Sequence, residues 1–122
     1  MNGAEFLLKC LEAEGVDIVF GYPGGAVIPL FDAIFDNKNI NHFRPAHEQG
    51  GIHAADGYAR VTGKPGVMIV TSGPGLTNAI TGLANAYLDS IPMVVISGQV
   101  GKGLLGKSSF QEVDTVGITM PI

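Results

Sequence analysis

The chain has 122 residues, of which 46% are hydrophobic and 15% charged, with 18 glycines, one cysteine and no tryptophan. This composition is typical of a single globular domain and excludes the disordered, collagen-like and disulfide-bonded classes. The net charge is −4 and the basic residues are scattered, so we expect no nucleic-acid partner and no membrane partner. Without an apolar run of about 18 residues or a leader pattern, we expect a cytoplasmic protein.

Helices and strands are predicted to alternate from the first residues onward. Asn2 is suited to cap a helix over residues 3–14. The apolar run after it predicts a short buried strand that begins near residue 17 and ends in the loop "GYPGG". A second helix is expected over residues 26–35, and it leads to the next strand near residue 40.

The second half of the chain repeats this pattern. Helices are expected over residues 48–63 and 76–90, and strands near residues 66 and 92. The strands are continuous, β-branched runs bounded by turn residues, which is typical of buried parallel strands. The sequence therefore predicts an α/β fold with an open parallel sheet and helices on both faces. The last fourteen residues form no complete unit, so we expect the domain to be truncated before its last units.

Each predicted strand ends in a glycine-containing loop, namely "GYPGG", "RPAHEQGG", "TSGPG" and "SGQVGKG". In an open parallel sheet these loops share the carboxyl edge, where such folds bind ligands. Tight turns also require Gly and Pro, and that alternative stays open for any single loop. Glu48 lies at this edge, either as a first-turn acid that the helix dipole favours or as a carboxyl group buried against a ligand nitrogen.

Four segments together resemble a known family: "GYPGGAVIPLFDAI", "PAHEQGGIHAADGYAR", "TSGPGLTNAITGLANAYLDSIPMVVISGQV" and "FQEVDTVGITMPI". In this order they are similar to the N-terminal pyrimidine-binding domain of thiamine diphosphate enzymes. Within that group they resemble the catalytic large subunits of acetolactate (acetohydroxyacid) synthases. The resemblance covers nearly the whole chain. It implies that residues 1–122 are a thiamine pyrimidine-binding domain that is incomplete at its C-terminal end.

The resemblance also implies roles for single residues. Glu48 would be the catalytic residue, a carboxyl group that pairs with a pyrimidine nitrogen of thiamine diphosphate and promotes removal of a thiazolium proton. The other residues implied in cofactor binding are Tyr22, Gly24, Gly25, Gly73, Pro74, Gly75 and Asn78. The residues implied on the substrate side are Ala26, Phe110 and Gln111. The alternative for Phe110 is a core or interface position, and for Gln111 a surface position.

The implied activity is decarboxylation of pyruvate and transfer of the two-carbon unit to a second 2-oxo acid, pyruvate or 2-oxobutyrate, in branched-chain amino acid biosynthesis. Mg²⁺ and FAD are expected only through domains absent from residues 1–122. Within residues 1–122 we predict no metal ligands. Because the site of this family forms between subunits, a homodimer or homotetramer is expected, with a regulatory small subunit as an optional partner.

The loop "GKGLLGKS", residues 101–108, departs from the family, which usually has proline at the position of Gly101. It also matches the G-x-x-x-x-G-K-[ST] motif of P-loop nucleotide-binding domains. That motif needs a helix directly after its Lys-Ser pair, and "SFQEVDTVGITMPI" favours a short helix at best. We therefore disfavour a nucleotide site. Two alternatives remain, a pyrimidine-domain subunit of a split 2-oxo acid decarboxylase and a fragment that is inert alone.

Overall fold

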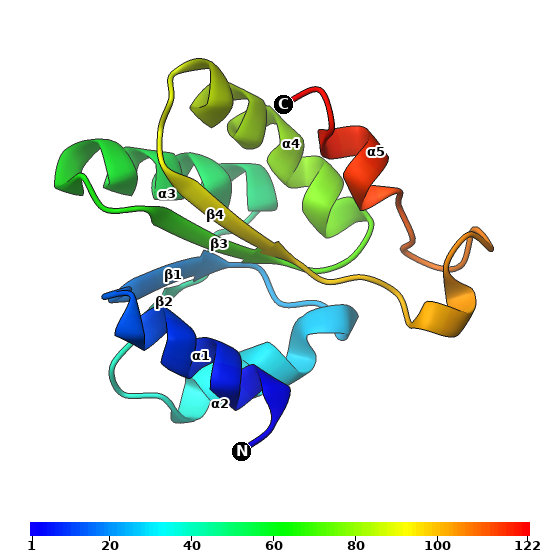
Figure 1. Ribbon diagram of the computed structural model, residues 1–122, viewed down its shortest axis with the longest axis horizontal. Helices are drawn as coiled ribbons and strands as arrows, with labels where there is room; N and C mark the ends of the chain where they lie inside the picture. Colours follow the sequence, from blue (N-terminus) through cyan, green and yellow to red (C-terminus); the bar gives the residue numbers. More distant parts are fainter.

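Four parallel strands form one sheet in the computed structural model, which describes residues 1–122 (Figure 1). They are β1 (Ile18–Gly21), β2 (Asn41–Phe43), β3 (Gly66–Val70) and β4 (Met93–Ser97). Their order across the sheet is β2-β1-β3-β4, and every neighbouring pair is parallel. Phe20 of β1 is in register with Phe43 of β2 and with Met68 of β3. The predicted open parallel sheet is confirmed.

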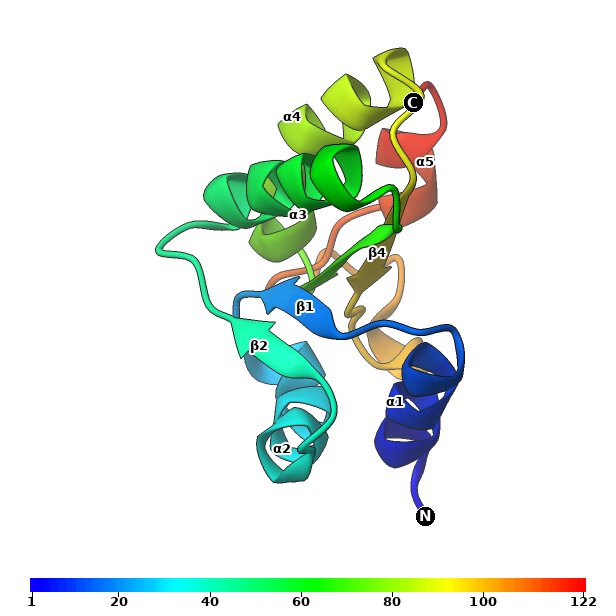
Figure 2. The ribbon, with the colours of Figure 1, turned by 90° about the vertical axis from the view of Figure 1, so that its left-hand side faces the viewer.

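Helices cover both faces of this sheet, also as predicted (Figure 2). They are α1 (Gly3–Ala13), α2 (Ile28–Asp36), α3 (Glu48–Thr62), α4 (Pro74–Leu88) and α5 (Thr115–Thr119), with short 3₁₀ turns η1 (Gly25–Val27) and η2 (Lys102–Leu104). Asn2 caps α1 in a reciprocal capping box with Glu5. Gly63 ends α3 in the left-handed conformation that glycine adopts without strain.

The central strand β3 separates two hydrophobic clusters. Because side chains alternate along a strand, Val67 and Ile69 pack toward α1 and α2, whereas Met68 and Val70 pack toward α3 and α4. All five residues of β3 are buried. The prediction of a buried strand was wrong for β2, whose three residues are exposed. The reason is its position at the edge of the sheet, which leaves one side without a neighbouring strand.

Residues 101–108, which match the P-loop motif, form η2 and an irregular turn. Ser108 adopts a left-handed backbone with φ +51°, and the next helix, α5, begins only at Thr115. A phosphate-binding loop instead leads directly into a helix whose free amides cradle the phosphate. The geometry therefore does not support the nucleotide-binding alternative. No helix in the structure combines the length and the apolar character that crossing a bilayer requires.

Candidate active site

The strand order reverses between β1 and β3: β2 was added on one side of β1, whereas β3 and β4 follow on the other side. β1 is followed by α2 on one face and β3 by α4 on the other, so the loops after these two strands lie at the switch point of the sheet, on its carboxyl edge. Residues 22–26 follow β1, and residues 71–75 follow β3. Two of the predicted cofactor loops therefore flank the position where open α/β sheets bind ligands.

Glu48 is the first residue of α3, and it is only 8% exposed. The preceding residue, His47, caps the helix because its Nδ1 accepts a hydrogen bond of 3.0 Å from the backbone N–H of Gln49. The helix dipole favours a negative charge at this end. Both sequence interpretations of Glu48 are thus compatible with its position, a first-turn acid and a buried carboxyl group.

One oxygen of this carboxyl group is held by α4. Asn78 Nδ2 donates a hydrogen bond of 3.0 Å to Glu48 Oε2. Oε1 accepts none, and since no buried side-chain oxygen or nitrogen in the structure lacks a hydrogen-bond partner, Oε1 reaches the surface. The hydrogen bond from Asn78 therefore restrains the carboxylate and leaves its other oxygen unpaired and accessible.

The loops after β1 and β3 are joined through Thr71, a buried residue that the sequence reasoning missed. Its Oγ1 accepts a hydrogen bond of 3.3 Å from the backbone N–H of Ala26. A Cβ on Gly24 would overlap the Thr71 side chain, and one on Gly75 would lie 2.9 Å from Thr71 Cγ2. The sequence did contain a signal for this role, because Thr71 is a hydroxyl residue placed between the apolar run of β3 and the loop "SGPG".

The remaining predicted residues differ in their surroundings. Tyr22 is half-buried and its N–H donates to the carbonyl of Ile69, whereas Gly25 has open space around its Cα. Pro74 is the first residue of α4. Phe110 is 87% exposed on this chain, so it is not part of the core of residues 1–122, and the alternative of an interface position stays open. Its neighbour Gln111 instead places its backbone against Gly73.

Residues 1–118 match the family described as "Thiamine pyrophosphate enzyme, N-terminal TPP binding domain". The chain belongs to this family. It is 57% identical to the acetolactate synthase large subunit of Lactococcus lactis over 99% of this chain and 21% of that protein. It is 57% identical to an acetolactate synthase of Mycobacterium bovis and 53% identical to a probable acetolactate synthase large subunit of Methanocaldococcus jannaschii. Each of these two matches covers 100% of this chain and 20% of the relative.

This TPP binding domain thus spans about one fifth of the length of the curated relatives it matches. Its residues suit the pyrimidine end of the cofactor, because a largely buried carboxyl group with one accessible oxygen is a good partner for a ring nitrogen and glycine loops allow close backbone approach. The structure contains no group of three or more His, Cys, Asp or Glu side chains that could hold a metal ion.

Proposed function

We propose that the protein containing this chain is a thiamine diphosphate-dependent acetolactate synthase and that residues 1–122 receive the pyrimidine end of its cofactor. The family match and the identity of 53–57% to acetolactate synthases from bacteria and an archaeon support the reaction. In this reaction pyruvate loses CO₂, and its two-carbon unit joins a second 2-oxo acid, pyruvate or 2-oxobutyrate. The products, 2-acetolactate and 2-aceto-2-hydroxybutyrate, feed branched-chain amino acid biosynthesis. Thiamine diphosphate, when bound, supplies the electron sink for the decarboxylation.

The catalytic role is supported by the burial and the hydrogen bonding of the Glu48 carboxyl group. It is buried, Asn78 holds Oε2, and Oε1 remains open at the carboxyl edge of the sheet. A carboxylate placed this way exchanges a proton with a ring nitrogen at Oε1 while the rest of the group cannot rotate away. Removal from water strengthens this hydrogen bond relative to the same contact on the surface.

The loops after β1 and β3 are proposed to seat the ring and the substrate. Gly24 and Gly75 pack closely against Thr71, which leaves no room for a side chain at either position. These loops would therefore present backbone rather than side chains to a ligand. Ala26 is exposed beside the loop after β1, and we place it with Phe110 and Gln111 on the substrate side. An exposed aromatic residue such as Phe110 is available to cover a substrate when the site closes.

Further parts of the protein are proposed to complete the site. A domain outside residues 1–122 would hold the diphosphate through Mg²⁺, and FAD would be bound outside these residues as well. We propose a homodimer or homotetramer, because the carboxyl edge offers only the pyrimidine half of a site. Relatives are named large subunits, which supports a regulatory small subunit as a further partner.

The test uses the full-length protein, thiamine diphosphate, Mg²⁺ and pyruvate, with 2-acetolactate formation as the readout. Glu48→Gln retains the size of the side chain and an acceptor for Asn78 but removes the ionisable group, so turnover should fall at least about 100-fold. Glu14→Gln, a change of an exposed glutamate after α1, is the matched control and should leave turnover unchanged. An inactive wild-type protein would contradict the reaction, and an active Glu48→Gln variant would contradict the role of Glu48.

A further inference from the structure

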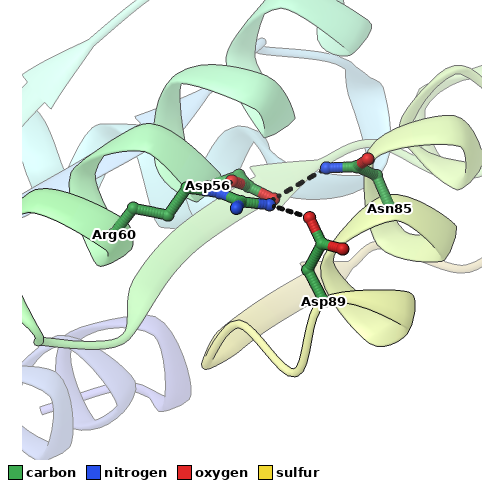
Figure 3. A network of polar contacts seen from close by, with 4 residues as sticks. All are labelled: Asp56, Arg60, Asn85 and Asp89. Carbon is green, nitrogen blue, oxygen red and sulfur yellow. Dashed lines mark hydrogen bonds and ion pairs between the residues drawn. The ribbon is translucent and has the colours of Figure 1, made fainter.

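Asp56 is a buried carboxylate that the proposed chemistry does not use. It lies on α3, two turns beyond Glu48, and is 4% exposed. Arg60 Nε donates to Asp56 Oδ1, and Asn85 Nδ2 of α4 donates to Asp56 Oδ2 over 3.2 Å. Arg60 Nη2 also donates to Asp89 Oδ2 over 2.6 Å. Figure 3 shows these four residues, which we call the Asp56 cluster, bridging the two helices.

The Asp56 cluster belongs to a regular series of contacts between α3 and α4. The helices run in the same direction, and successive turns of one meet successive turns of the other. The four contacting pairs, in chain order, are Glu48–Asn78, Ile52–Gly82, Asp56–Asn85 and Arg60–Asp89. The candidate catalytic carboxylate is therefore one end of the same interface whose other end is the Asp56 cluster.

The middle contact sets the distance between the helices. Gly82 is buried against the side chain of Ile52, and a Cβ on Gly82 would overlap that side chain. Such apolar contact brings the helices close, but it has little directional preference along their axes. Hydrogen bonds do have such a preference, because they weaken steeply when the distance or the angle changes.

A slide of one helix along the other would misalign the contact at the site. One residue of helix corresponds to a rise of about 1.5 Å. A slide of that amount lengthens the 3.0 Å contact between Asn78 Nδ2 and Glu48 Oε2 and tilts it out of line, and a hydrogen bond weakens as its distance and angle depart from the optimum. The Asp56 cluster resists this movement, since a slide would strand the buried Asp56 carboxylate without its partner on α4.

We propose that the Asp56 cluster is a positioning device that fixes the register of α3 against α4 and so holds Asn78 on Glu48. Its catalytic consequence rests on the proposed function. The exposed part of the cluster, Arg60 at 42% and Asp89 at 50%, contributes little to stability as a surface ion pair. Its contribution is geometric, because it ties the last turn of α3 to the end of α4.

The test is a double-mutant cycle in the full-length protein with Asn85→Ala and Asn78→Ala. We expect Asn85→Ala to lower kcat about three- to tenfold when Asn78 is present, which corresponds to the loss of one aligned hydrogen bond. In the Asn78→Ala background, where there is no contact left to misalign, the same change should have little further effect on kcat. Asp89→Asn repeats the test at an exposed position, where we expect the substitution to leave the fold intact.

A second readout does not depend on activity. If the two pairs share one register, the fall in Tm of the double variant should be smaller than the sum of the two single falls. Lys64→Ala breaks the ion pair of Lys64 with Asp17 outside the α3–α4 interface and is the matched control, expected to add its effect to that of Asn78→Ala. Strictly additive effects of Asn85→Ala and Asn78→Ala on both kcat and Tm would overturn the proposal. An inactive wild type would instead count against the proposed function, and the Tm cycle would still test the register.

Discussion

The backbone of Gln111 closes over the Cα of Gly73 at the start of α4. A Cβ on Gly73 would lie 2.5 Å from the carbonyl oxygen of Gln111, and Gly73 itself has φ +58°. The two residues belong to loops that follow different strands, β3 and β4. Their contact attaches the segment that carries Phe110 and Gln111 to the loop proposed to receive the pyrimidine ring.

Gly73→Ala should therefore destabilise the domain and weaken cofactor binding together. A side chain at this φ is strained and also displaces Gln111, at a cost of about 1–3 kcal/mol. The measurement is the Tm of the full-length protein with and without thiamine diphosphate. Gly101→Ala is the control, because that position has φ −55° and open space, and its Tm should match the wild type. Equal behaviour of both variants would contradict a special role of the Gly73 contact.

Glu112→Gln should loosen the loop before Phe110. The Glu112 carboxylate accepts hydrogen bonds from the N–H of Gly106 at 2.5 Å and from the N–H and Oγ of Ser109 at 3.0 and 3.2 Å. The backbone donors of Gly106 and Ser109 also hold the pKa of Glu112 below its usual value. An amide has one acceptor oxygen and cannot serve both ends of the turn.

We expect trypsin to cleave the Glu112→Gln variant after Lys107 about tenfold faster, as the loss of roughly one hydrogen bond implies. The KM for pyruvate should rise while the Tm stays close to that of the wild type. Ser109→Ala removes only the hydroxyl contact and should have a smaller effect. Unchanged cleavage in Glu112→Gln would show that another contact orders this loop.

Acid should weaken the Asp56 cluster in a defined range of pH. The hydrogen bond from Arg60, followed by that from Asn85, holds the pKa of Asp56 below the usual value of an aspartate. A pKa that is lower in the folded state means that the unfolded chain binds more protons on acidification. The stability that Asp56 contributes is thus complete well above the usual aspartate pKa and is lost as the pH falls through the lower folded-state pKa.

The measurement is the Tm of the wild type and of Asp56→Asn between pH 6 and pH 3, values chosen to bracket the ordinary aspartate pKa of about 3.9. The variant should be less stable at the upper end, and the difference should narrow toward the lower end. Asp17→Asn should behave in the same direction, because the Tyr58 hydroxyl and Lys64 lower the pKa of Asp17. A difference that stays constant across this range would mean that the charge of Asp56 does not stabilise the fold.

The loop over residues 101–108 should not bind nucleotide, despite its match to the P-loop motif. Its Lys107 and Ser108 lie in an irregular turn, and no helix follows them directly. We expect ATP with Mg²⁺ to leave the Tm of the wild type unchanged, and equally that of Lys107→Ala. A rise in Tm with ATP that Lys107→Ala abolishes would restore the nucleotide-binding interpretation.

The helices and strands and their order could be predicted from local sequence patterns. Short apolar runs, glycine loops and helix caps act over a few residues, so the strand starts and the helix ended by Gly63 could be predicted from local chemistry. Glu48 could also be placed at a helix start on the carboxyl edge, because parallel strands bring the loops after them to one side.

The contacts between these elements could not be predicted in the same way, because they depend on packing across the whole fold. The exposure of β2 depends on its place at the edge of the sheet, which strand composition does not encode. The contact of Asn78 with Glu48 and that of Asn85 with Asp56 join residues 30 and 29 positions apart. Such contacts arise when α3 and α4 settle over the same face of the sheet at a distance that Gly82 permits. Local propensity carries no information about that distance, since it is set by packing between helices rather than within them.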